Sequence, residues 1–239
     1  MPQAQASETW VVHPHDPIEK LESNLWRVEG SLPNMPLRRV MTVARLASGG
    51  LVVYNAIALE EAAMQEVDAW GKVEYIIVPN AWHKLDAKRF AERYPNAKVI
   101  APASGREKVV AVVARAAGPE QLPENADIVI QEFGGTRERE LYMTVRSGSG
   151  ISLIVADALF NMPHLTGVQG FLLRHITRSS GGPVVSRVSR AILVKDKKAY
   201  AEQLRSLATP DLRRVIVAHH QVISESPAET LRQVASTVG

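Results

Sequence analysis

The order of apolar segments along the chain constrains its fold more than any other feature. The short apolar runs 73–79 and 97–102 are typical of buried strands, and each precedes apolar residues at helical spacing, over 84–95 and 104–117. A further pair of β-type runs around glycines predicts a hairpin over 41–56. Strands that alternate with helices in this way predict a layered α/β fold.

The second half of the chain has a different pattern. Three β-type runs follow one another with turn residues between them, which favours antiparallel pairing, and a last strand and two helices complete the chain. Asp196 is the expected N-cap of the first of these helices. Residues 161–192 are rich in glycine and serine and give no clear pattern. The predicted strands are 126–133, 139–147, 150–160 and 213–220, and the helices are 196–208 and 226–237.

Composition and length limit the class of protein. Residues 1–36 are rich in proline and polar residues and are interpreted as an arm with one strand, packed on a single domain over 37–239. The absence of cysteine excludes thiolate zinc sites and disulfides and, with no signal peptide evident, favours a cytoplasmic protein. No basic aromatic stripe and no run of 18 apolar residues occur, so neither a nucleic-acid partner nor a membrane partner is expected.

Polar side chains follow three of the predicted strands. Asn80, His83 and Asp86 follow the first, Asp157 interrupts the second, and His219 with His220 ends the third. Imidazole and carboxylate groups that converge from strand ends are the usual ligands of zinc, iron or manganese. Such an ion lowers the pKa of water and makes hydroxide available as a nucleophile.

These phrases resemble those of the metallo-β-lactamase fold, a four-layer αββα sandwich. In active members of that family a strand leads into His-x-His-x-Asp-His, a later strand ends in a metal-bridging aspartate, and the last strand ends in histidine. "VADALFN" resembles the aspartate phrase, so Asp157 corresponds to the metal-bridging aspartate. "VIVAHHQVI" resembles the final phrase, so His219 corresponds to the last histidine. "IIVPNAWHKLDAKRF" stands where the first motif belongs.

The likeness is closest to an uncharacterised branch of that fold, described as a domain of unknown function or as β-lactamase-like. Three phrases carry it and cover roughly residues 37–225. They are "RRVMTVARLASGGLVVYNAIAL", "VPNAWHKLDAKRFAERYPNAKVIAP" and "SLIVADALFN".

The metal motif is degenerate. With His83 on the second histidine of the motif, Ala81 replaces the first histidine, Leu85 the aspartate and Asp86 the third histidine. No histidine lies between His83 and His164, so the middle ligand of the family is absent. The resemblance therefore implies at most one metal ion, a zinc, iron or manganese held by His83, Asp157 and His219, or no metal.

Each candidate also has a purely structural interpretation. His83 can cap the following helix, and Asp86 in the first turn of that helix favours its dipole without any function. A buried Asp157 requires a partner, which need not be a metal. The side chains of His219 and His220 should point to opposite sides of the strand, so one of them faces the site. His164 and His220 are reserve ligands.

Two functional hypotheses remain open at this stage. In the first, the protein is a hydrolase of an ester, phosphoester or lactone, with His83, Asp86, Asp157 and His219 as metal ligands or as general acid and base. In the second, it is a non-catalytic binding or assembly module. Both imply a small-molecule ligand or substrate, whose identity the sequence does not give. The apolar residues in "FLLRHITRSSGGPVV" favour a homodimer.

Overall fold

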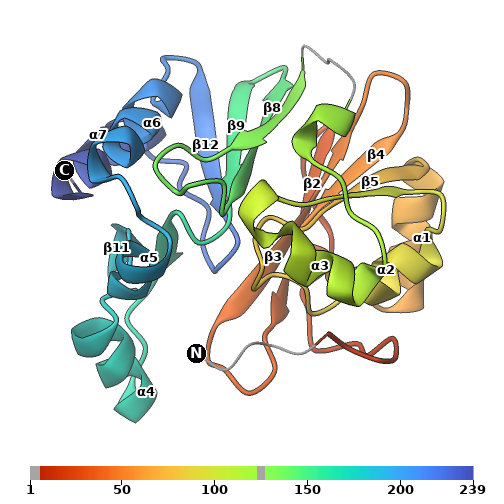
Figure 1. The fold of residues 1–239 in the computed structure, drawn as a ribbon, viewed down its shortest axis with the longest axis horizontal. Coiled ribbons are helices and arrows are strands. Elements are labelled where there is room, and N and C mark those ends of the chain that lie inside the picture. Colours follow the sequence, from red (N-terminus) through yellow and green to blue (C-terminus); the bar gives the residue numbers. More distant parts are fainter. Residues whose placement is uncertain (1–5, 123–126, 239) are drawn as a thin grey trace.

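Two β-sheets pack face to face, and helices cover the outer face of each (Figure 1). This architecture is seen in a computed structural model, which describes residues 6–122 and 127–238. It confirms the predicted four-layer αββα sandwich. Residues 1–5 of the expected arm, residue 126 of the predicted strand 126–133 and residue 239 lie outside the described residues.

The larger sheet comes from the first half of the chain. Its strands follow the order of the sequence, with antiparallel pairing from β1 to β4 and parallel pairing from β4 to β6. The glycine that turns the predicted 41–56 hairpin, Gly49, has a φ of +92°, which a side chain would strain. The strands are β1 (Glu19–Glu22), β2 (Leu25–Ser31), β3 (Arg38–Arg45), β4 (Leu51–Tyr54), β5 (Val73–Ile77) and β6 (Lys98–Ile100).

The smaller sheet has the strand order β12-β9-β8-β7. The predicted antiparallel pairing joins β7, β8 and β9, while β12 lies parallel to β9. The expected strand 150–160 is shorter than predicted, because the chain turns after Val155 and starts a separate two-stranded ribbon of β10 and β11. The strands are β7 (Ile128–Glu132), β8 (Leu141–Ser147), β9 (Gly150–Val155), β10 (Phe160–Met162), β11 (Gly182–Val184) and β12 (Leu212–Val217).

Among the described residues, three helices cover the larger sheet, two cover the smaller one, and a further helical segment lies beside the sandwich. α1 (Glu61–Trp70), α2 (Ala87–Arg93) and α3 (Arg106–Val113) cover the larger sheet, and α6 (Lys197–Leu207) and α7 (Pro227–Val238) cover the smaller one. The segment without a clear sequence pattern forms α4 (Gly167–Phe171), the short helical segment η3 (Leu172–Ile176) and α5 (Arg187–Ile192). Two single turns, η1 (Ala103–Gly105) and η2 (Pro119–Gln121), complete the helical elements.

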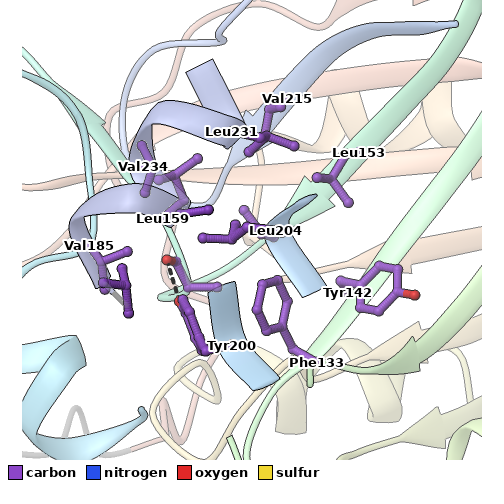
Figure 2. Close-up of a cluster of buried hydrophobic side chains, with 14 of the residues drawn as sticks. Phe133, Tyr142, Leu153, Leu159, Val185, Tyr200, Leu204, Val215, Leu231 and Val234 are labelled. Atoms are coloured by element: carbon purple, nitrogen blue, oxygen red, sulfur yellow. Dashed lines mark hydrogen bonds between the residues drawn. The ribbon is translucent and has the colours of Figure 1, made fainter. Parts of the chain in front are cut away.

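Apolar side chains fill three separate layers. Val40, Tyr54 and Ile77 of the larger sheet meet Met143 and Ile154 of the smaller one between the two sheets. A second layer lies under α1, α2 and α3. Figure 2 shows part of the third, in which side chains of α6 and α7 pack on the smaller sheet.

The N-terminal arm contributes more to the sheet than the sequence predicted. One strand was expected in 1–36, but β1 and β2 both form and lie at the edge of the larger sheet. Trp26 stacks on Trp70 with ring centroids 3.8 Å apart, and Trp10 stacks on Phe90 at 5.4 Å. These aromatic contacts attach the arm to the helical layer.

No helix in the part of the chain that the structure describes combines the length and apolar character needed to cross a bilayer.

The predicted cap of α6 is confirmed and gives a first prediction. The Asp196 carboxylate accepts a hydrogen bond from the Ala199 N–H at 3.0 Å. Replacing Asp196 with alanine leaves this N–H without its partner and is expected to lower the free energy of unfolding by about 1 kcal/mol. Urea denaturation measures the loss. Asp196→Ser, which keeps an acceptor oxygen at the cap, should stay within about 0.5 kcal/mol of the wild type, and an equal loss in both variants would contradict the capping role.

Candidate functional site

A pocket of about 210 Å³ opens where strands of the two sheets end. Its wall includes residues that follow β4, β5, β9 and β12, two parallel pairs of strands that belong to different sheets. The carboxyl ends of parallel strands are where layered α/β folds place ligand sites, because the loops there are held by a rigid scaffold. This is the position at which the sequence placed its polar clusters.

Three of the predicted site residues meet in this pocket. The His83 Nε2 atom lies 3.2 Å from Asp157 Oδ2, and His219 Nε2 lies 3.4 Å from Asp157 Oδ1. The ligating atoms of the three residues all lie within 4.8 Å of one another. The two imidazole rings have centroids 5.3 Å apart, and Phe160 stacks on His219 at 5.2 Å. Loops from three distant parts of the chain therefore form one cluster.

The Nδ1 atom of each imidazole, which points away from Asp157, is hydrogen-bonded to an oxygen acceptor. His83 Nδ1 lies 2.9 Å from Asn55 Oδ1, and His219 Nδ1 lies 2.8 Å from the Arg38 carbonyl oxygen. The Asn55 amide is oriented by its own Nδ2, which donates to the Val40 carbonyl at 2.8 Å. Since both partners accept, each Nδ1 carries the proton, and each Nε2 is left to face Asp157.

This arrangement requires positive charge beside Asp157. An ionised carboxylate only accepts hydrogen bonds, so each Nε2 must either carry a second proton or share a cation with it. Burial would raise the pKa of Asp157, but the charge on His83 and the hydrogen bond from His219 outweigh it and hold that pKa well below its usual range. Asp157 is therefore an anion held between two imidazoles.

A second buried carboxylate lies behind Asp157 and shapes its loop. Glu140, immediately before β8, is fully buried and accepts the backbone N–H groups of Ala156, Asp157 and Ala158 at 3.1, 3.0 and 2.9 Å. Because three successive N–H groups donate to one side chain, they cannot continue the hydrogen bonding of β9, and the strand ends there. The tight turn at Asp157 is therefore stabilised by Glu140, which lies just before β8.

Asn80 joins the two carboxylates. Its Nδ2 donates to Asp157 Oδ2 at 2.9 Å and lies 3.3 Å from Glu140 Oε2. Its Oδ1 accepts the N–H groups of Trp82 and His83 at 2.9 and 3.2 Å, which fixes the loop that carries the imidazole. Burial and the neighbouring Asp157 charge raise the pKa of Glu140 to about 8, against the opposing effect of its N–H donors.

Asp86, the fourth residue predicted for the site, lies in a different environment. Its Oδ2 accepts Arg39 Nη1 at 2.6 Å and the Ala58 N–H at 3.0 Å, and the carboxylate is fully buried. It does not line the pocket and is not in the three-residue cluster. Asp86 holds Arg39 and the loop after β4 in place, so the structure separates it from the other three residues.

The reserve histidines also lie apart from the cluster. His220 is turned away from Asp157 and accepts the Arg38 N–H through Nε2 at 3.3 Å. Burial and the nearby His219 lower the pKa of His220 to about 4, which keeps it neutral. His164 is exposed and lies 3.0 Å from Ser180 Oγ through Nδ1. The expectation that only one of His219 and His220 faces the site agrees with this geometry.

Two parts of the site were missed from the sequence. Glu140 ends the charged phrase "TRERE", and nothing local separates it from exposed Glu138. The segment 161–192 supplies much of the pocket wall, including Leu173 of η3, Val188 and Ile192 of α5, and Leu193 just after it. A charge that immediately precedes an apolar strand is the one signal that marks Glu140.

The three clustered residues fit one metal ion. Two imidazole nitrogens and one carboxylate oxygen are the protein ligands of many catalytic zinc sites. Two ligands bound tetrahedrally at ordinary zinc distances lie roughly 3.3–3.5 Å apart; His83 lies 3.2 Å from one oxygen of Asp157 and His219 lies 3.4 Å from the other, and one ligand atom from each residue lies within 4.8 Å of the other two. The Nδ1–H groups already have the carbonyl partners that metal-bound histidines normally have. A second ion finds no comparable ligand group among the described residues.

Comparison with known proteins agrees with the fold. A family model described as a domain of unknown function (DUF4336) matches residues 31–105, a range that contains His83. No curated protein sequence matches the chain. Over 200 solved chains are structurally similar, and the likeness to the metallo-β-lactamases and to a domain of unknown function predicted from the sequence is confirmed.

Three solved structures illustrate the likeness. The metallo-β-lactamase from Erythrobacter litoralis, with β-mercaptoethanol in its active site, has a TM-score of 0.57 and 12% identity over 92% of this chain and 96% of its own. The DIM-1 metallo-β-lactamase has a TM-score of 0.61 and 11% identity, over 96% and 100%. The metallo-β-lactamase FIM-1 from Pseudomonas aeruginosa, in its mono-zinc form, has a TM-score of 0.58 and 9% identity over 96% of this chain and 98% of its own. At these identities the likeness establishes the fold alone.

Proposed function

We propose that this protein is a hydrolase of small molecules, with a site that holds at most one metal ion. The observation that carries the proposal is the cluster of His83, Asp157 and His219, in which both imidazoles are oriented from behind and both Nε2 atoms face the carboxylate. A folding role alone would not require two Nδ1 anchors that direct Nε2 toward a pocket. The residues open into that pocket together.

The protein groups have distinct tasks in such a reaction. Asp157 is kept ionised and accepts a hydrogen bond from Asn80. It also accepts a hydrogen bond from water and so directs the water oxygen at the substrate carbon. When no metal is bound, an Nε2–H of His83 or His219 can donate its proton to the leaving oxygen as the carbon–oxygen bond breaks; when a metal is bound, both Nε2 atoms would be ligands and that proton would come from the attacking water. A divalent ion held by the three side chains would supply Lewis acidity and lower the pKa of water there.

Metal analysis of the protein purified without added metal tests the proposal. We expect about one equivalent of zinc, iron or manganese per chain, removal by chelator, and loss of the bound metal in His219→Ala. His164→Ala is the matched control, because His164 is exposed and outside the cluster, and it should retain the metal. Metal that stays in His219→Ala would contradict the assignment of the ligands.

A non-catalytic binding module is the second candidate, and one observation favours it. Ala81, in the place of the first motif histidine, is buried, so no further ligand reaches the cluster from that position. In this case the protein would bind no metal, cleave no ester, phosphoester or lactone after metal is added, and keep its stability in chelator. That combination of results would replace the hydrolase proposal.

A further inference from the structure

The pocket beside the cluster is largely apolar. Leu32 and Leu37 from the loop before β3 line it, together with Phe160, Leu173, Val188 and Leu193. Small polar groups, among them Ser179 and Ser186, add hydroxyls to the wall without adding charge. A surface of this kind stabilises hydrocarbon groups, because binding removes them from water.

The charge of the pocket wall distinguishes between a phosphate ester and an uncharged carbonyl compound as the substrate. Arg39 is the one arginine among the described lining residues, and no lysine lines the pocket. Its positive charge is already balanced by Asp86, 2.6 Å away, and its Nε donates to the Ser31 carbonyl at 3.1 Å, while its Nη2 is buried without a partner among the described residues. A phosphate ester brings negative charge that needs free cationic partners. An uncharged carbonyl compound needs none, so the wall favours a neutral substrate.

The volume limits the size of the hydrocarbon group. The pocket measures about 210 Å³, whereas an apolar cavity of about 150 Å³ holds a benzene molecule. One ring or a short alkyl chain therefore fills the pocket, and the remainder of a long fatty chain would extend beyond it without further contact with the apolar wall. Leu173 of η3 and Val188 of α5 place this limit in the segment 161–192.

We propose that the substrate is a neutral carboxylic ester, a cyclic ester included, that carries one ring or a short alkyl chain on its acyl side. Its carbonyl lies at His83, Asp157 and His219, and its hydrocarbon group lies against the apolar wall. In the reaction, the oxygen of water bonds to the carbonyl carbon, the bond from that carbon to the alkoxy oxygen breaks, and the leaving oxygen takes the proton. This inference rests on the proposed hydrolase function.

A series of p-nitrophenyl esters tests the substrate class with the metal-loaded protein. We expect kcat/KM for the hexanoate and benzoate to exceed that for the acetate by about tenfold or more, and the dodecanoate to show no further gain over the hexanoate. p-Nitrophenyl phosphate should be cleaved at least about 100-fold less efficiently than the hexanoate. A series with no dependence on the acyl group, or with the phosphate preferred, would overturn the inference while leaving a hydrolase.

Two variants locate the hydrocarbon group. Val188→Trp places a large ring in the pocket and should lower the hexanoate-to-acetate ratio of kcat/KM by about tenfold. Val168→Trp is the matched control, since Val168 on α4 is 78% exposed and does not line the pocket. An unchanged ratio in Val188→Trp would show that the acyl group lies elsewhere.

Binding without turnover separates this inference from the function on which it rests. 2-Heptanone has a carbonyl and a short alkyl chain but no ester bond, and it should raise the Tm of the wild type more than that of Val188→Trp. If the ketone stabilises the protein and no ester is cleaved, the pocket preference is supported and the hydrolase proposal fails. If neither is observed, both are overturned.

Discussion

Replacing Glu140 with alanine is expected to lower the free energy of unfolding by about 3–5 kcal/mol. The carboxylate is fully buried and accepts three backbone N–H groups and the Asn80 amide. Alanine leaves all four donors without acceptors in a dry environment and adds a cavity. Since domains of this kind unfold at a cost of about 5–15 kcal/mol, the variant should be folded but close to its limit.

Urea denaturation with tryptophan fluorescence measures the Glu140 effect. Glu140→Gln keeps one acceptor oxygen for Ala156 and Ala158, but its amide would face the N–H of Asp157, so an intermediate loss is expected. Glu202→Ala, on the exposed side of α6, is the control for removing a glutamate and should change stability by less than about 0.5 kcal/mol. A loss below about 1 kcal/mol in Glu140→Ala would refute the anchoring role.

Replacing Asp157 with asparagine is expected to lower kcat/KM by about 10³-fold and metal affinity by at least about 100-fold. The substitution keeps the size of the side chain and removes the negative charge between His83 and His219. One amide atom would also face the Asn80 Nδ2 donor or an imidazole, so the favourable contacts of the anion are not reproduced. Circular dichroism checks that the fold is kept.

The control for Asp157→Asn is Asp196→Asn, which makes the same chemical change at the exposed cap of α6. It should keep full activity and metal content, because asparagine caps a helix as well as aspartate does. Activity of Asp157→Asn within about tenfold of the wild type would remove the carboxylate from the proposed chemistry.

The sequence located the strands around the site well, since their apolar runs are local properties. The runs that became β5, β6 and β12 each end in two or three consecutive buried apolar residues. The end of β9 was missed, because "SLIVADALF" is apolar on both sides of Asp157. The chain turns there because Glu140, just before β8, accepts hydrogen bonds from three N–H groups, and such a tertiary contact leaves no local pattern.

The role of Asp86 could not be predicted from the sequence either, because it too depends on a tertiary contact. Its place in the phrase "HKLDAKRF" is three residues after His83, and that spacing alone fits a ligand as well as it fits a buried partner for Arg39. The distinction depends on the position of β3, which is distant in sequence. The segment 161–192 gave no clear pattern because its helical elements, of five or six residues each, are too short to show a helical period.

The predicted homodimer stays a prediction. The apolar residues Val168, Phe171, Leu172 and Ile176 of α4 and η3 are 46–78% exposed. In Figure 1 this segment lies at the edge of the molecule, away from both sheets.

The two imidazoles differ in how far substitution of the residues that orient them would disturb the site. His219 is oriented by the peptide oxygen of Arg38, which every amino acid possesses, so drift in the residue type at position 38 leaves that acceptor in place. His83 depends on the amide side chain of Asn55, which a single codon change can remove. Laboratory evolution of this pocket should therefore accept many residues at position 38 and very few at position 55.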